Sequence, residues 1–520
     1  MSSRGGRRPV RSASASARRT WKRLEPIRRR VRRRFEVDTR ALATARIALA
    51  LILFVDLVHR AGDMVLFYTD RGTYPIAAYE VTYSQYTGYS LHALSGDLWF
   101  QQLMFVVAGL FALAFLVGYR TRLVGFVSFL LLFSLHARNP GVLNGADRLL
   151  RVLLLVALLA PLGERWSVDA LRRGSARTRV ASVGTAVLLL QPIVLFTSNA
   201  MLKHAGENWY AGDGLEIAML NDSIRFYLGN VIVEYPALMT ALNYAWVGMI
   251  AGSALFLLAT VGRVRALAAL AYFGAFVGML LTMAVGLFPL VLIAAVLPFL
   301  TPPFWDAIAA RVPAHWRTQL PDREQFGPLG RPPLERRLLA ALRERGYTGL
   351  AAFPRSALTV LSVLVLVWML LFAASDVTGR DVPDRIDYSH LDQQSWGLYA
   401  PDPSEGYVWY VVEAEFPDGT TIEPVSGGAV DFDRPPDGSV AYENFRHRKF
   451  MRLVWSSSEG RTTSRIVNGY AEWACRQAHD ARDGQADRIT VYRFYQPSPL
   501  DGEYEEPSQW TVIERPCVDG

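Results

Sequence analysis

The chain alternates between long apolar segments and short polar connections. The apolar segments are close in length to the roughly 20 residues that a helix needs to cross about 30 Å of hydrocarbon. The predicted membrane-spanning segments are residues 41–58, 98–117, 123–135, 149–162, 180–202, 237–260, 266–285, 287–300 and 356–374. The pattern therefore predicts a multi-pass α-helical membrane protein with about nine transmembrane helices.

Basic residues follow every second predicted span. They lie at 119–122, within 163–179, at 262–265 and in the Arg- and Pro-rich segment 302–353, whereas the loop 63–97 holds a single arginine and no lysine. Cytoplasmic loops are the ones enriched in Lys and Arg. We therefore expect a protein of the cell membrane with a cytoplasmic N-terminus and a C-terminal region outside the cytoplasm.

The pattern changes after residue 380, where apolar and polar residues alternate over short runs. These runs are 407–416, 450–455 and 488–495, and Asp-Gly turns punctuate the region. Alternation with period two is typical of antiparallel strands, and one helix is expected at 464–479. Residues 380–520 are thus predicted to form a β-rich extracytoplasmic domain.

Charge divides the chain further, on a background of 51% hydrophobic and 20% charged residues. Residues 1–40 hold 15 basic against 3 acidic residues (+12), whereas residues 380–520 hold 14 against 25 (−11). A basic arm before a first span is expected to face anionic lipid, and no nucleic-acid-binding module accompanies it, so nucleic acid is not an expected partner. The predicted divisions are a disordered cytoplasmic arm (1–35), a transmembrane domain (36–306), a basic cytoplasmic segment (307–355), a last transmembrane helix (356–375) and the acidic C-terminal domain (380–520).

Both cysteines, Cys475 and Cys517, fall in the predicted extracytoplasmic domain. A disulfide is expected there if the domain lies outside the cytoplasm, and two free thiols are the alternative. Two cysteines are too few for a metal cluster of the Cys-x-x-Cys kind, and no metal site is expected.

Two groups of charged residues lie at predicted helix ends. At the end of the first span, Asp56 and Arg60 are four residues apart and share one helical face, which favours an ion-paired helix end. After the third span, Asn144, Asp147 and Arg148 stand among further arginines at the start of a helix. Capping explains part of this second group, but so many polar residues between apolar helices also indicate a water-filled cavity or a bound ligand.

The strongest single candidate is Lys203, where the fifth span ends in M-L-K-H-A-G-E-N-W-Y. An ionisable group at such a position is costly to desolvate, which makes Lys203, His204 and Trp209 a candidate site. A buried lysine has a lowered pKa and can act as a general base. The alternative is a structural lysine that extends to the membrane interface beside an anchoring tryptophan.

Several motifs, taken in order, resemble one family. They are F-Y-T-D-R-G-T-Y-P, G-Y-R-T-R-L, S-L-H-A-R-N-P-G-V-L-N-G-A-D-R-L-L-R, L-K-H-A-G-E-N-W-Y-A-G and G-L-F-P-L-V-L-I-A-A-V-L-P-F-L, with a weaker match at Q-Q-S-W-G-L-Y-A-P-D-P. The region 36–306 is similar to the HTTM family of prokaryotic membrane proteins, which share their membrane domain with the vitamin K-dependent gamma-carboxylases.

The resemblance implies a role for particular residues. In the carboxylases a lysine in the matching segment is the base that activates reduced vitamin K, and Lys203 is the candidate equivalent. The carboxylases also carry a histidine directly after the asparagine that matches Asn144, where this chain has Gly145. The resemblance therefore implies the fold and a quinone as candidate cofactor, but not the complete carboxylation site.

Two functions follow as hypotheses. In the first, Asn144, Asp147, Arg148, Lys203, His204 and Trp209 line an outward-facing polar cavity that binds or acts on a quinone, a lipid or an exported peptide. In the second, the protein is a non-enzymatic scaffold or maturation partner whose tail binds an exported protein. Deleting the tail is expected to abolish function in the second case and to spare ligand binding in the first.

Overall fold

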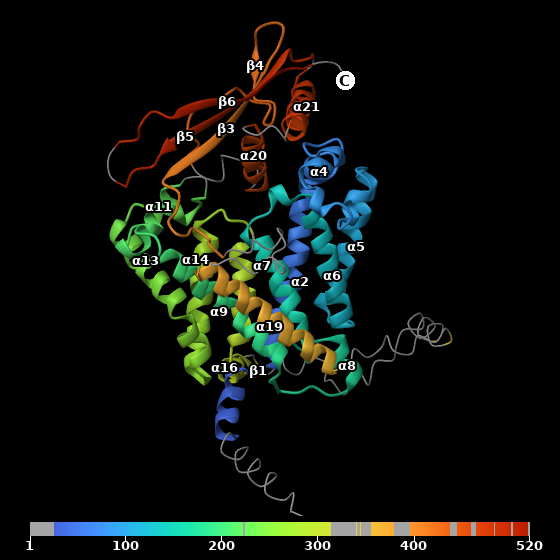
Figure 1. Ribbon diagram of the computed structural model, residues 1–520, viewed down its shortest axis with the longest axis vertical. Helices are drawn as coiled ribbons and strands as arrows, with labels where there is room; N and C mark the ends of the chain where they lie inside the picture. Colours follow the sequence, from blue (N-terminus) through green and yellow to red (C-terminus); the bar gives the residue numbers. More distant parts are fainter. Residues whose placement is uncertain are drawn as a thin grey trace, which may run out of the picture.

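The structure is a computed structural model that describes residues 25–221, 224–311, 355–378, 396–436, 445–458, 464–482, 484–500 and 503–517, with three isolated positions (313, 340 and 344). Most of the predicted basic arm (1–35), most of the predicted basic segment (307–355) and the first part of the tail lie outside these residues. The described part consists of a large helical bundle with a sheet domain above it (Figure 1).

Each predicted membrane-spanning segment is helical. The helices are α2 (Thr39–Gly62), α5 (Leu98–Leu116), α6 (Thr121–Arg138), α7 (Gly145–Leu159), α9 (Val183–Lys203), α13 (Pro236–Ala251) with the π-helical turn η4 (Ala254–Ala259), α14 (Gly262–Thr282), α15 (Phe288–Val296) with the 3₁₀ turn η5 (Leu297–Phe299), and α19 (Arg355–Thr378). Within the described residues, six helices are long and apolar enough to cross a membrane, or seven if one bent pair counts as a span. These helices are compatible with a multi-pass membrane protein.

The nine predicted crossings are thus not all matched by a helix of spanning length. Helix α7 has 15 residues and begins with the charged Asp147 and Arg148, and α13 has 16 residues before its geometry changes to a π-helix. Helix α15 and η5 join α16 (Pro302–Arg311) through a bend of 100°. The predicted segment 149–162 was itself short of the roughly 20 residues that a span needs, and Pro289, Pro298 and Pro302 interrupt the last of these helices.

Helix α9 is the central helix of the bundle, and α19 is peripheral. In their most apolar windows, 72% of the α9 residues are buried in the protein but only 11% of the α19 residues. A capping box of Ser182 and Thr185 starts α9, and one of Asn144 and Asp147 starts α7. These caps satisfy backbone N–H groups that have no partner within the helix.

Short helices occupy the connections at the two ends of the bundle. Towards the sheet domain lie α3 (Met64–Tyr68), α4 (Ile76–Thr82), η1 (Ser84–Tyr86), η2 (Leu91–Leu94), η3 (Pro140–Val142), α10 (Asn208–Ala211), α11 (Gly214–Leu220) and α12 (Leu228–Ile232). At the opposite end lie α8 (Val168–Arg173), α16 and the two-stranded sheet of β1 (Val37–Asp38) and β2 (Arg179–Val180) (Figure 1).

The C-terminal domain is a four-stranded antiparallel sheet with two helices. Its strands are β3 (Gly406–Glu415), β4 (Thr421–Ile422), β5 (Arg488–Pro497) and β6 (Ser508–Pro516), in the order β4-β3-β5-β6. Helices α20 (Phe445–Ser458) and α21 (Ser464–Ala481) lie between the sheet and the bundle (Figure 1). The predicted strands at 407–416 and 488–495 and the predicted helix at 464–479 are confirmed.

The predicted strand at 450–455 is wrong, because this segment belongs to helix α20. Its buried residues include His447, Phe450, Met451 and Val454, which recur at the helical spacing of three and four residues. A run of six residues was too short to separate this pattern from alternation. Phe450 also packs against Phe67 of α3, with ring centroids 5.5 Å apart, so the two domains share an apolar core.

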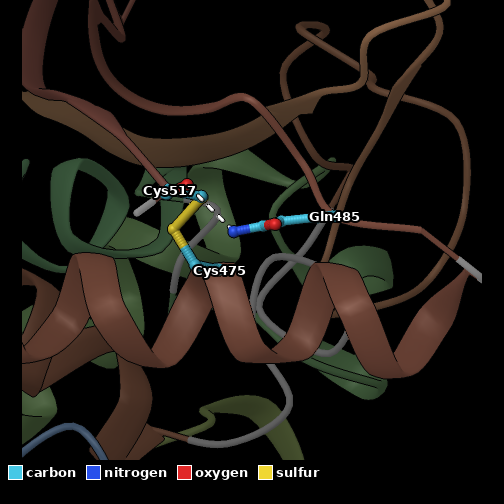
Figure 2. Close-up of a disulfide and its surroundings, with 3 residues drawn as sticks. All are labelled: Cys475, Gln485 and Cys517. Carbon is cyan, nitrogen blue, oxygen red and sulfur yellow. Dashed lines mark hydrogen bonds between the residues drawn. A yellow bond between two sulfur atoms is a disulfide. The ribbon is translucent and has the colours of Figure 1, made fainter. Parts of the chain in front are cut away.

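Cys475 of α21 and Cys517, which follows β6, form a disulfide (Figure 2). Their Cα atoms are 5.7 Å apart, and 42 positions separate them along the chain. The Gln485 amide donates a hydrogen bond to the Cys517 carbonyl oxygen (3.3 Å). The disulfide therefore fixes the C-terminal end of strand β6 to helix α21.

Candidate functional site

Lys203 is the last residue of α9, and its side chain points into the protein. Its ammonium group donates a hydrogen bond to the carbonyl oxygen of Tyr399 (2.7 Å) and lies 3.2 Å from the centroid of the Trp209 ring. The residue is only 2% exposed. A carbonyl oxygen accepts from the ammonium, and an aromatic face attracts a cation, so both contacts favour the charged lysine.

Tyr399 belongs to a loop, residues 396–402, that precedes β3 and lies against the ends of α9 and α10. Each hydrogen bond between this loop and the helices joins a side chain to a backbone N–H or carbonyl group. The bonds run from Asn199 Nδ2 to the carbonyls of Trp396 (2.8 Å) and Leu398 (3.0 Å), from Trp209 Nε1 to that of Tyr399 (2.8 Å), and from the backbone N–H groups of Glu207 and Asn208 to the Asp402 carboxylate (3.1 and 3.0 Å). The described start of the tail is therefore bound to the Lys203 segment.

A small cavity of about 100 Å³ lies beside Lys203, between α9, α14 and α15. Its walls are mostly hydrophobic. They are formed by Leu195, Phe196, Asn199, Lys203, Trp209, Leu215, Ala218, Trp246, Met279, Met283, Val285, Phe288, Leu292, Leu398 and Tyr399. Lys203 and Asn199 are the polar side chains of this apolar cavity, so a bound molecule would be mainly hydrophobic with one polar end.

A larger cavity of about 700 Å³ lies between the bundle and the C-terminal domain. Four cations line it: Arg448, Lys449 and Arg452 of α20, and Arg493 of β5. Asn144 and Asn221 add amide groups, and none of the lining residues that the structure describes is acidic. This cationic cavity suits a ligand with a carboxylate, a phosphate or another electron-rich head.

The two cavities adjoin. Both are lined by Val285, Phe288, Leu398 and Tyr399, so the 396–402 loop and the start of α15 form a shared wall. An apolar space next to a cationic space matches the two parts of an amphiphile.

Burial and neighbouring positive charges both lower the pKa of Lys449. Burial, followed by the nearby guanidinium groups of Arg448, Arg452 and Arg148, lowers the pKa of Lys449 from 10.5 to about 8, and Asp147 opposes this weakly. A cluster of like charges in a partly desolvated space is costly without an anion. A bound anion would offset the repulsion among these cations.

Asn144 and Asp147 begin α7 as a reciprocal cap. The Asn144 side chain accepts from the backbone N–H of Ala146 (2.8 Å), and Asp147 accepts from the backbone N–H of Asn144 (2.8 Å). Asn144 also donates to the Val285 carbonyl (3.3 Å) and lines the cationic cavity. The second oxygen of Asp147 faces away from the cavity, into a buried ionic network.

Arg60 is the centre of that buried network. It donates to Asp56 (2.8 Å), to the Tyr68 hydroxyl (2.7 Å) and to Asp147, and it lies 3.2 Å from His136 Nε2. Arg60 and Asp56 are 0% and 1% exposed. The predicted ion pair of Asp56 with Arg60 is present. Arg60 also binds a second carboxylate that was not predicted, that of Asp147, which lies 87 positions further along the chain in another helix.

The C-terminal domain joins the same network through Arg446 of α20. Its guanidinium donates to Asp56 (2.8 Å) and lies 3.5 Å from Asp63. The ligand atoms of Asp56, His136 and Asp147 lie within 4.8 Å of one another, a spacing that could hold a metal ion. Because Arg60 contacts all three side chains, its guanidinium already supplies the positive charge that a metal ion would bring to them.

The structure brings some of the predicted site residues together and separates others. Lys203 and Trp209 line the apolar cavity, and Asn144 lines the cationic one. His204 is exposed and packs edge-on against Tyr210, with ring centroids 4.8 Å apart, so it does not line either cavity. Asp147 belongs to the buried network, and Arg148 acts on the site through its charge near Lys449.

The cations of the C-terminal domain were missed from the sequence. Arg448, Lys449 and Arg452 belong to the run R-H-R-K-F-M-R, which is basic within an otherwise acidic region. That local reversal of charge was a usable signal for a site. Arg493 stood in a predicted strand and gave no signal of its own.

The chain was also compared with known proteins. No protein-family model, no curated protein and no solved structure matches it.

Proposed function

We propose that this protein is a multi-pass protein of the cell membrane that binds an amphiphile in the two joined cavities. The proposal places the N-terminus in the cytoplasm and the C-terminal domain outside it. Supporting this orientation, the basic connection with α8 lies at the end of the bundle opposite the C-terminal domain (Figure 1). The observation that carries the proposal is the shared wall of an apolar and a cationic cavity.

In this proposal the polar head of the ligand occupies the cationic cavity and its hydrophobic part occupies the apolar cavity. The electron-rich head lies among Arg448, Lys449 and Arg452, and the hydrophobic part reaches towards Lys203 past Phe288. A quinone and a lipid both have this chemistry, whereas the head alone would fit an acidic side chain of an exported peptide.

Lys203 is proposed as a ligand contact or as a base towards a quinol, as the resemblance to the HTTM family and the gamma-carboxylases implies. A base must be neutral, yet the Tyr399 carbonyl and the Trp209 ring favour the ammonium form. These two contacts oppose loss of the lysine proton, whereas the burial of Lys203 favours it. Gly145 lines the cationic cavity at the position where the carboxylases carry a histidine, so carboxylation coupled to quinol oxidation lacks that group here.

A specific observation favours the scaffold as a second candidate. Lys203 makes its hydrogen bond and its cation–π contact within the chain, which is what a purely structural lysine would do. The tail also supplies walls to both cavities, so deleting it would remove ligand binding as well as any binding of an exported protein. Point substitutions are therefore needed to separate the two functions.

The test is mass spectrometry of small molecules that copurify with the full chain. The variants are Lys203→Met, which keeps side-chain length without charge, and Arg452→Gln in the cationic cavity. Arg515→Gln is the matched control, because Arg515 is an exposed arginine of β6 that lines neither cavity. We expect a quinone or a lipid with the wild type and the control, and several-fold less with either variant.

Two results would overturn the proposal. Wild-type protein carrying no amphiphile above the level of a detergent blank would do so, as would equal occupancy in all four proteins. Thermal unfolding of each variant shows whether a loss of ligand reflects a loss of fold, since Lys203→Met also removes a hydrogen bond to the 396–402 loop.

A further inference from the structure

A third cavity, of about 560 Å³, lies beside α8. Helix α8 is at the end of the bundle opposite the C-terminal domain (Figure 1). Five elements form its walls: the start of α6, the end of α7, helix α8, the start of α9 and the first turns of α19. Its lining residues combine arginines with a hydrophobic floor that includes Leu123, Leu162 and Leu358. The amphiphile site proposed above does not involve any of these residues.

The charge of this third cavity is unbalanced. Arg120, Arg122, Arg173 and Arg177 face two carboxylates, those of Glu164 and Asp169. Among the described lining residues, four cations against two anions leave an excess of two positive charges. This positive charge can attract a ligand only if the two carboxylates already have partners within the chain.

Both carboxylates are held by groups of the chain. Glu164 forms an ion pair with Arg177 (2.7 Å) and a looser one with Arg173 (3.6 Å). Asp169 accepts from the backbone N–H groups of Arg120 (2.9 Å) and Thr121 (2.7 Å) at the start of α6. Arg122, in contrast, forms no hydrogen bond or ion pair with any residue that the structure describes.

The hydrophobic side of the third cavity opens towards α19. This helix packs on α9, yet only 11% of its most apolar window is buried, so most of its surface would face lipid. Thr359 is an exposed residue of α19 that lines the cavity. The cavity therefore has a cationic rim and an apolar wall continuous with a lipid-facing helix.

We propose that the third cavity binds an anionic phospholipid. The phosphate lies at Arg122 and Arg173, and the acyl chains follow the apolar surface between α6 and α19. A free phosphate or a soluble anion would gain nothing from the leucine floor, and a zwitterionic lipid would gain less from the excess positive charge. Basic pockets between membrane helices are known to hold anionic lipid head groups in this way.

The test is native mass spectrometry of the detergent-purified full chain, titrated with phosphatidylglycerol and, separately, with phosphatidylcholine. Arg122→Gln is compared with Arg263→Gln. Both arginines are exposed and occupy the second position of a predicted span helix, α6 or α14, but only Arg122 lines the cavity. We expect Arg122→Gln to weaken phosphatidylglycerol binding roughly five-fold and Arg263→Gln to leave it unchanged.

A second variant tests the hydrophobic half. Thr359→Phe places a ring in the acyl path at an exposed helix position, where it is not expected to unfold the protein, and should also reduce phosphatidylglycerol binding several-fold. Retained binding in either cavity variant overturns the proposal, and so does an equal loss in Arg263→Gln or equal affinity for the two lipids. Displacement of the lipid by millimolar inorganic phosphate would indicate a site for the free anion instead.

Discussion

Helix α20 carries cations into two buried environments of opposite character. Arg446 enters the network at Arg60, where two arginines meet the three carboxylates of Asp56, Asp63 and Asp147. Within the next two turns, the same helix places Arg448, Lys449 and Arg452 around the cationic cavity, where the described lining residues include no carboxylate. The two regions therefore differ in charge balance, although one helix supplies cations to both.

This difference separates a structural role from a ligand-binding one. In the network each charge removed from water has a partner within hydrogen-bonding distance, so the group can hold the C-terminal domain to the bundle without a ligand. In the cationic cavity, charges of one sign lie close together and repel one another. A bound anion is the physical reason that we infer for this arrangement.

The largest expected effect is the loss of the network's central cation. Arg60→Met leaves Asp56 and Asp147 buried beside each other without their shared guanidinium. We expect a loss of about 3–5 kcal/mol in the free energy of unfolding, the usual result of breaking a buried ion pair from one side. Tryptophan fluorescence during denaturant unfolding of the purified protein measures this loss.

Arg452→Met is the matched change in the other region. It removes a cation from a group that has an excess of them, so the free energy of unfolding should stay within about 1 kcal/mol of the wild type or increase. Equal destabilisation by the two substitutions would mean that the cationic cavity is as structural as the network, and the contrast between the regions would be lost.

The helical part of this fold could be predicted because its signals are local. Apolar segments of the right length became helices, and the pairing of Asp56 with Arg60 follows from a spacing of four residues on one helix. The strands β3 and β5 likewise followed from alternation along ten residues each. Helix lengths were less predictable, since α13 changes to the π-helical turn η4 within the span expected at 237–260.

The candidate site was only partly predictable because its contacts are distant in sequence. Lys203 and Trp209 stand six residues apart and were found together, but the carbonyl that binds Lys203 belongs to Tyr399. No local pattern predicts that a loop 196 positions away will bind there. The cations of α20 were missed for a related reason, since reading their segment as a strand hid the face that they share.

The next effect concerns pH, and it distinguishes the cationic cavity from the network. Burial and the neighbouring arginines lower the pKa of Lys449 to about 8, against 10.5 for an ordinary lysine. Below pH 8 the lysine is charged in both folded and unfolded chains, and the cost of crowding is constant. Between pH 8 and pH 10.5 the folded protein loses this proton while the unfolded chain keeps it. The free energy of unfolding should therefore rise by at most about 1.4 kcal/mol per pH unit.

Anion binding should respond in the opposite direction, because a neutral Lys449 attracts an anion less. Denaturant unfolding and ligand occupancy, each measured from about pH 7 to about pH 9.5, give the two slopes. Lys449→Gln removes the titrating group and should flatten both, leaving only the pH dependence of the rest of the protein. Identical slopes in the wild type and this variant would remove Lys449 from the site.

The smallest effect on stability is expected where the two cavities meet. A Cβ atom added at Gly145 would lie 2.8 Å from Leu398 Cδ2 and 3.7 Å from Phe288 Cε2. In Gly145→Ala the end of the Leu398 side chain can move, and alanine suits the first turn of α7 better than glycine, so unfolding should change by no more than about 1 kcal/mol.

Ligand occupancy should nevertheless fall in Gly145→Ala, because Leu398 would be pushed into the shared wall of the cavities. Gly248→Ala is the control, since an added Cβ there meets no atom within 4 Å. Quantifying the copurified amphiphile in both variants gives the comparison. If Gly145→Ala retains as much ligand as Gly248→Ala, the apolar and cationic cavities do not act as one site, and the charge excess on α20 must serve a ligand that never reaches Lys203.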